Sequence, residues 1–167
     1  AGVFTSSTGN AGSFTRIAGG VKDAADSIPG WKGYDNSLTA GEFAGGWGRT
    51  VIALAPSNQN ILYVMVENAD DAAAGKPEAD LFKCNMATTP FTWTKSDTLV
   101  AQRKTSSATT SRYIELQGGY NMLLGVHPNN SDLVLAGGVN LFRSLDGFAT
   151  KDNSSFIGGV ASTTYTD

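Results

Sequence analysis

Cysteine and histidine are almost absent from this sequence, and their scarcity excludes several kinds of chemistry. Cys84 is the only cysteine and His127 the only histidine among 167 residues. A lone cysteine forms no internal disulfide, and these two residues do not supply the ligand set of a zinc site. We therefore expect no cofactor and neither redox nor zinc chemistry. Cys84 is interpreted as a small buried or turn residue, and His127 as a structural turn residue.

Charged residues are also scarce, at 16% of the chain, whereas a typical soluble domain has roughly 25%. The net charge is −3, and the arginines are scattered rather than clustered: Arg16, Arg49, Arg103, Arg112 and Arg143. A basic face for nucleic acid is therefore not expected. No apolar run approaches the roughly 18 residues of a transmembrane helix, so we also expect no membrane span.

What the chain has instead is glycine, at 20 residues, together with many serines, threonines and asparagines. This composition favours short strands joined by tight turns over helices, whose exposed faces usually carry Glu, Lys and Arg. We expect an all-β chain. Because it begins at Ala1 without a methionine, we expect a processed product or an excerpt of a longer protein.

An internal repeat is visible in the sequence. Segment 51–64 recurs as segment 122–135, with Pro56 aligned to Pro128 at an offset of 72 residues. Each copy reads as an apolar strand, a proline-led turn rich in polar residues, and a second apolar strand. This pattern is typical of a β-hairpin and predicts the two inner strands of a propeller blade.

Further short strands follow each hairpin. Segments 81–84 and 141–144 share a Leu-Phe-basic pattern, and segment 3–6 resembles them; we expect third strands there. Segments 13–17 and 91–94 are expected to form fourth strands. The predicted unit is a four-stranded propeller blade. We expect the outer strands of a first blade at 1–17, followed by a loop rich in glycine and aromatic residues at 18–48. A second blade is expected at 49–96, with an acidic insertion at 67–80. A polar loop at 97–111 should then lead to a strand at 112–116, which begins a third blade with the start of the next connection at 112–167.

Segment 142–150 resembles the Asp-box, or bacterial neuraminidase repeat, whose pattern is S-x-D-x-G-x-T-W. Ser144, Asp146 and Thr150 match the pattern, while Phe148 and Lys151 stand where it has its later glycine and its tryptophan. In the preceding repeat only the final Thr-Trp pair matches, at 92–93. The hairpin at 48–63 is similar to the first strands of blades in secreted sortilin-like and xyloglucanase-like propellers.

The resemblance implies a turn device rather than a catalytic group. The Asp146 carboxylate would accept backbone N–H bonds, and Gly147 would supply a positive φ. The resemblance also places the box between the outer strands of a blade, away from the ligand-binding face. Because 167 residues hold about two blades and propellers close with four to eight, we expect an incomplete ring, completed by the rest of a larger propeller protein or by other chains.

Candidate ligand-binding residues lie in the loop at 18–48. Sugar rings stack on aromatic side chains, and this loop contains Trp31, Tyr34, Phe43 and Trp47. Asp35 and Glu42 lie among these aromatics and are the candidate acids of a glycosidase, which needs two carboxyl groups across the scissile bond. The alternative is a glycine-rich loop packed by its own aromatic side chains, which we consider the better interpretation.

The acidic insertion contains four candidate oxygen ligands for calcium: Asp70, Asp71, Glu78 and Asp80. Their spacing matches no calcium loop such as the EF-hand, so a solvated acidic loop is favoured.

Two functions remain open from the sequence. The favoured one is a non-catalytic extracellular or cell-surface module that binds carbohydrate or a surface protein through its loops. The alternative is a fragment of a sialidase-like or xyloglucanase-like glycoside hydrolase. Against this alternative, the arginines form no recognisable cluster for a substrate carboxylate.

Overall fold

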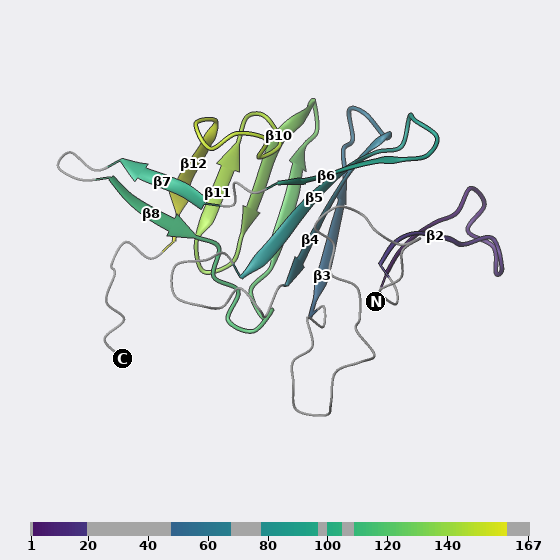
Figure 1. Ribbon diagram of the computed structural model, residues 1–167, viewed down its shortest axis with the longest axis horizontal. Coiled ribbons are helices and arrows are strands. Elements are labelled where there is room, and N and C mark those ends of the chain that lie inside the picture. The colour runs from purple at the N-terminus through teal and green to yellow at the C-terminus, as the bar shows by residue number, and fades with distance from the viewer. Residues whose placement is uncertain (1, 20–47, 68–77, 97–99, 105–108, 160–167) are drawn as a thin grey trace.

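The computed structural model describes residues 2–19, 48–67, 78–96, 100–104 and 109–159 (Figure 1). This part of the chain consists of antiparallel β-strands and contains no helix. The predictions of an all-β fold and of four-stranded antiparallel sheets are therefore confirmed.

The first sheet has four strands, which lie side by side in the order in which they occur in the chain. They are β3 (Thr50–Leu54), β4 (Ile61–Glu67), β5 (Ala79–Asn85) and β6 (Thr92–Ser96). The turn between β3 and β4 satisfies its own backbone: Asn58 Oδ1 accepts the Asn60 N–H at 3.1 Å, and Ala55 N–H donates to the Ile61 carbonyl at 2.9 Å. This self-bonding is why asparagine suits such turns.

The second sheet repeats this arrangement with β9 (Leu123–His127), β10 (Asn130–Gly137), β11 (Leu141–Ser144) and β12 (Ser154–Gly158). The two sheets also share their register. Leu54, Leu62 and Cys84 lie opposite one another in the first sheet, and Val126, Val134 and Ser144 do so in the second. The sequence repeat is thus a repeat of strand pairing.

Two separate hairpins accompany the sheets: β1 (Gly2–Thr5) with β2 (Thr15–Gly19), and β7 (Val100–Lys104) with β8 (Thr109–Tyr113). The second hairpin differs from the prediction of a polar loop at 97–111 followed by a strand at 112–116. The strand ends at Tyr113 because the backbone groups beyond it bond elsewhere: the Ile114 carbonyl accepts the Glu78 N–H at 3.0 Å.

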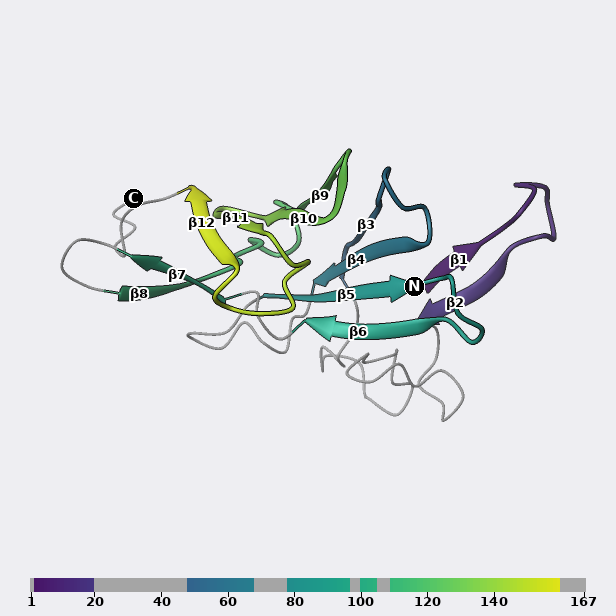
Figure 2. The same cartoon turned by 90° about the horizontal axis from the view of Figure 1, so that it is seen from above.

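The first sheet lies between hairpin β1–β2 on one side and the second sheet on the other (Figure 2). Alternate residues of a strand point to opposite faces, and two apolar clusters follow this alternation. Tyr63, Met65 and Leu81 pack toward the second sheet, whose Val134 and Phe142 belong to the same cluster. The residues between them pack with Val3 and Ala18 of the hairpin: Leu62, Val64, Val66, Phe82 and Cys84. Strand β4 is buried from Ile61 to Val66 because both of its faces are covered.

Candidate functional site

Residues 114–122, which we call the bridging segment, cross the same end of both sheets. At the first sheet, Glu78 Oε2 accepts the N–H groups of Leu116 at 2.6 Å and Gln117 at 3.2 Å. At the second sheet, the Glu115 carbonyl accepts the Val139 N–H at 2.9 Å. We call this the bridged end; it is the lower end of the sheets in Figure 1. The β3–β4, β5–β6, β9–β10 and β11–β12 turns lie at the opposite end.

A polar cluster at the bridged end connects β3, β4 and the bridging segment. Glu67 Oε2 accepts the Arg49 N–H at 3.1 Å, and Arg49 Nη1 donates to the Tyr120 carbonyl at 3.1 Å. The Glu67 carboxylate lies against Gly48 and Gly119, where a Cβ atom would collide with it. A side chain at either position would have to displace the Glu67 carboxylate, and Gly119 in addition adopts a φ of 74°, which favours glycine.

Tyr120 presents its side chain to solvent beside this cluster. Its backbone carbonyl is fixed by Arg49, while 79% of the residue is exposed. Gly118 and Gly119, with φ of 67° and 74°, turn the chain just before it. A phenol ring held on a fixed backbone and open to solvent is suited to stacking on a sugar or on an apolar side chain.

Two buried side-chain oxygens at this end, Thr50 Oγ1 and Asn140 Oδ1, have no hydrogen-bond partner among the described residues. Thr50 begins β3, and Asn140 lies in the turn between β10 and β11, where it is only 2% exposed. An unpaired buried polar atom costs about 1–3 kcal/mol. Such groups tend to lie at functional positions.

The predicted calcium ligands are only partly within the described residues. Glu78 binds backbone N–H groups, and Asp80 forms an ion pair with Lys95 at 2.9 Å. Asp70 and Asp71 lie outside the described part of the chain. Within that part, no group of three or more His, Cys, Asp or Glu side chains is placed to hold a metal ion. The favoured interpretation, a solvated acidic loop, stays a prediction.

The predicted ligand-binding loop also lies outside the described residues, so the positions of its candidates stay predictions: Trp31, Tyr34, Asp35, Glu42, Phe43 and Trp47. Residues 20–47 are followed directly by Gly48, which contacts Glu67 at the bridged end. Residues 68–77 join Glu67 to Glu78, both at the same end. Chain connectivity therefore attaches both long connections to the bridged end.

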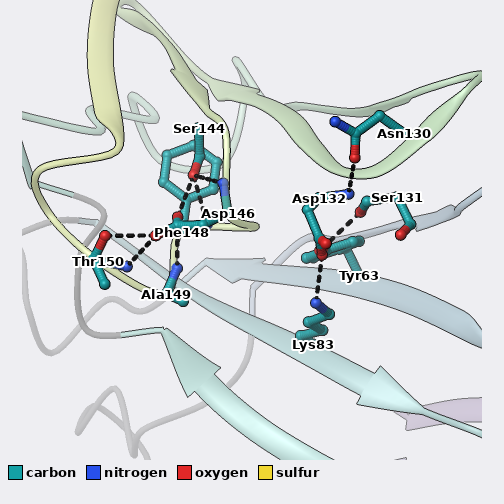
Figure 3. Close-up of polar contacts among 10 residues, drawn as sticks. All are labelled: Tyr63, Lys83, Asn130, Ser131, Asp132, Ser144, Asp146, Phe148, Ala149 and Thr150. Atoms are coloured by element: carbon teal, nitrogen blue, oxygen red, sulfur yellow. Dashed lines mark hydrogen bonds and ion pairs between the residues drawn. The ribbon is translucent and has the colours of Figure 1, made fainter.

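The turn at 144–150, whose sequence resembles the Asp-box, lies at the opposite end, between β11 and β12 (Figure 3). Ser144 Oγ accepts the N–H groups of Asp146 at 3.2 Å and Phe148 at 2.8 Å, and donates to Asp146 Oδ1 at 2.8 Å. Asp146 in turn accepts the N–H groups of Ala149 at 3.2 Å and Thr150 at 3.1 Å. Gly147 has a φ of 70°. These contacts are those expected of a turn device.

The electrostatics of this turn follow from the same bonds. Burial raises the pKa of Asp146, but hydrogen bonds from Thr150, Asn153, Ser144 and Ala149 outweigh it and hold the pKa below its usual value of 3.8. A carboxylate that is kept ionised and already accepts several hydrogen bonds is a poor general acid.

Phe148 explains how the turn tolerates its departures from the Asp-box pattern. It adopts a φ of 62° where the pattern has glycine, and its ring is buried in the cluster between the two sheets. Left-handed backbone is unfavourable for a residue with a side chain, and burial of the ring offsets that cost. Phe148 thus supplies the packed aromatic residue that Lys151 does not.

A junction of polar groups joins the two sheets at their turn ends, and the sequence did not reveal it. Tyr63 of β4 donates to the Ser131 carbonyl at 3.0 Å. Lys83 of β5 pairs with Asp132 at 2.7 Å, and its ammonium lies 5.7 Å from the centroid of the Tyr63 ring. Figure 3 shows the Tyr63–Ser131 and Lys83–Asp132 contacts, which connect β4 and β5 with the start of β10. The only available signal was the basic residue shared by the third-strand segments at 83 and 143.

The titration behaviour of this junction fits a structural role. Burial raises the pKa of Tyr63, and the nearby Lys83 opposes this only in part. Burial lowers the pKa of Lys83, but the hydrogen bond to Asp132 and the neighbouring Tyr63 outweigh it, so that the pKa lies above its ordinary value. Both groups therefore stay protonated near neutral pH.

Cys84 and His127 occupy positions without evident reactivity. Cys84 is fully buried, and burial raises the pKa of its thiol to about 11. His127 ends β9, and its Nδ1 atom accepts the Asn129 N–H at 3.2 Å.

Comparisons with models of protein families, with curated proteins and with solved structures returned no match. No helix in the described residues is long and apolar enough to cross a membrane.

Proposed function

We propose that this chain is a non-catalytic extracellular or cell-surface module of the β-propeller type, and that it binds carbohydrate or a surface protein at the bridged end. The observation that carries the proposal is the attachment of the long connections and the bridging segment to one end of the sheets. Binding residues commonly lie on loops that a rigid scaffold positions. The Asp-box turn lies at the other end, as the resemblance implies for a structural element.

The propeller arrangement is supported by how the sheets meet. Each sheet has its four strands in sequential order, and the first strands, β3 and β9, contact each other. Blades of a propeller are four-stranded sheets arranged radially, with their first strands nearest the axis. Further blades, from the rest of a larger protein or from other chains, would complete the ring.

Tyr120 is the best described candidate for contact with a ligand. We expect the full chain to bind a subset of ligands on an array of plant and host glycans. Tyr120→Ala should weaken this binding about two- to tenfold, because the sugar loses an aromatic partner worth about 0.5–1.5 kcal/mol. Trp31→Ala and Trp47→Ala test the aromatic residues of the predicted loop in the same assay.

Phe14→Ala is the matched control, because Phe14 is an exposed aromatic residue on hairpin β1–β2. It should leave binding unchanged. Equal loss with Phe14→Ala and Tyr120→Ala would contradict the site. Turnover of any glycan on the array, abolished by Asp35→Asn or Glu42→Gln, would replace the proposal with the glycoside hydrolase.

A further inference from the structure

The two sheets are copies of one unit, so each residue of the first sheet has an equivalent in the second. The shared register pairs Tyr63 with Lys83 in the first sheet and Leu135 with Arg143 in the second. By the same register, Leu81 corresponds to Leu141. What covers a position in one sheet can therefore be compared directly with what covers its equivalent in the other.

We call the face of each sheet that is turned toward the preceding part of the chain its backward face, and we compare this face first. In the second sheet, Leu124 and Val126 of β9 pack against the cluster that contains the first sheet. Their equivalents in β3, Ile52 and Leu54, are 60% and 47% exposed. Ile52 and Leu54 stay exposed because hairpin β1–β2 packs against β4 and β5 and does not reach β3. Covering β3 would require further strands beside the hairpin.

The opposite face, which we call the forward face, differs in the same way between the sheets. In the first sheet, Tyr63, Met65 and Leu81 are fully buried on this face by the second sheet. On the forward face of the second sheet, Leu123, which is the equivalent of Val51 by register, is 48% exposed. Seen from above, hairpin β7–β8 lies on the other side of this sheet, the side of the first sheet (Figure 2).

The charges repeat as well. Lys83 projects from the forward face of the first sheet and pairs with Asp132, which lies at the start of β10 in the following sheet. Its equivalent, Arg143, is an exposed basic residue on the forward face of the second sheet. A guanidinium is suited to pairing with a carboxylate across an interface.

We propose that the forward face of the second sheet is a docking surface for a further four-stranded antiparallel sheet of the same repeat, whose first turn carries a carboxylate that pairs with Arg143. The argument is continuity: the interface between the first and second sheets has the same strand register, the same kind of apolar side chains and the same basic residue. Another copy's second sheet does not fit as the partner, because its own backward face is occupied by its first sheet.

This inference rests on the propeller arrangement of the proposed function but not on ligand binding. The test uses the full chain and an extended chain in which residues 97–159 are repeated once after Asp167. Leu123→Cys is introduced into the original second sheet of both proteins. We expect a thiol reagent to label this cysteine about tenfold or more slowly in the extended chain, because the added sheet covers it.

Three comparisons give this measurement its specificity. Leu54→Cys, on the backward face of β3, should react equally fast in both proteins. Val134→Asp in the added copy places a charge at a buried interface position and should abolish the protection of the Leu123→Cys thiol. Arg143→Asp in the original sheet should also reduce protection, and Asp132→Lys in the added copy should restore it.

Equal labelling of the Leu123→Cys thiol in the 167-residue and extended chains overturns the proposal, whether the added sheet folds elsewhere or does not fold. Failure of Asp132→Lys to rescue Arg143→Asp overturns the assignment of the carboxylate. Neither outcome bears on glycan binding, so the two proposals fail separately.

Discussion

At the scale of single residues, the contact between Gly147 and Tyr63 is the tightest meeting of the two sheets. A Cβ atom at Gly147 would collide with the Tyr63 hydroxyl, and Gly147 N–H donates to the Asp132 carbonyl at 2.7 Å. One glycine therefore serves both the Asp-box turn and the junction between sheets.

Gly147→Ala should destabilise the fold by about 1–2 kcal/mol from its left-handed backbone alone, with a further contribution from the collision. Tyr63→Phe alone should cost about 1 kcal/mol through the lost hydrogen bond to Ser131. The double variant should lose less than the sum, because the substituted ring lacks the colliding oxygen. Urea unfolding of the four proteins measures this, and additive losses would contradict the contact.

Asp146 should make stability depend on acid. Its pKa is lower in the folded chain than its usual value of 3.8, so its ionisation stabilises the fold above that value, and the contribution is lost as pH falls through the folded pKa. Asp146→Asn should unfold at a lower temperature at pH 7 and show a weaker further decline between pH 5 and pH 2. Thermal unfolding across this range tests it; parallel curves for the two proteins would refute it.

Cys84 should be protected from thiol reagents until the chain unfolds. Its pKa of about 11, against an ordinary 9.0, implies about a hundredfold less thiolate at pH 8, and the side chain is fully buried. Labelling with iodoacetamide should therefore proceed only in denaturant. Native labelling as fast as in denaturant would show that the site is open.

At the scale of elements, the bridging segment holds its place through Glu78. Glu78→Ala should cost about 1–3 kcal/mol, because the N–H groups of Leu116 and Gln117 lose their acceptor. Amide hydrogen exchange at Leu116 should accelerate accordingly. Glu78→Gln keeps one acceptor oxygen and should therefore recover part of the lost stability. If both substitutions have equal effects, Glu78 does not stabilise the bridging segment by accepting these hydrogen bonds.

The elements also show what the sequence predicted and why the rest was missed. Apolar strands separated by proline-led turns predict both sheets. The spacing of Ser144, Asp146 and Thr150 predicts the hydrogen bonds within the turn at 144–150. The β7–β8 hairpin lacks an apolar alternation in sequence, and the Glu78–Leu116 bond joins distant positions through no local pattern. The aromatic loop at 18–48 stays a prediction.

At the scale of the whole molecule, the core between the sheets makes them one folding unit. Phe148→Ala should cost about 3–5 kcal/mol, because it opens a cavity between the sheets, whereas Leu145→Ala at an exposed neighbouring position should change stability by less than about 0.5 kcal/mol. Chemical unfolding of both variants provides the comparison. Similar losses would mean that the Phe148 ring contributes little to the junction.

The placement of the Tyr63–Ser131 and Lys83–Asp132 contacts has a practical consequence for engineering. Both lie at the turn ends of the sheets, remote from the position where residues 68–77 join Glu67 to Glu78. The chain therefore offers a natural insertion point: a foreign peptide grafted between Glu67 and Glu78 leaves the contacts that hold the sheets together untouched.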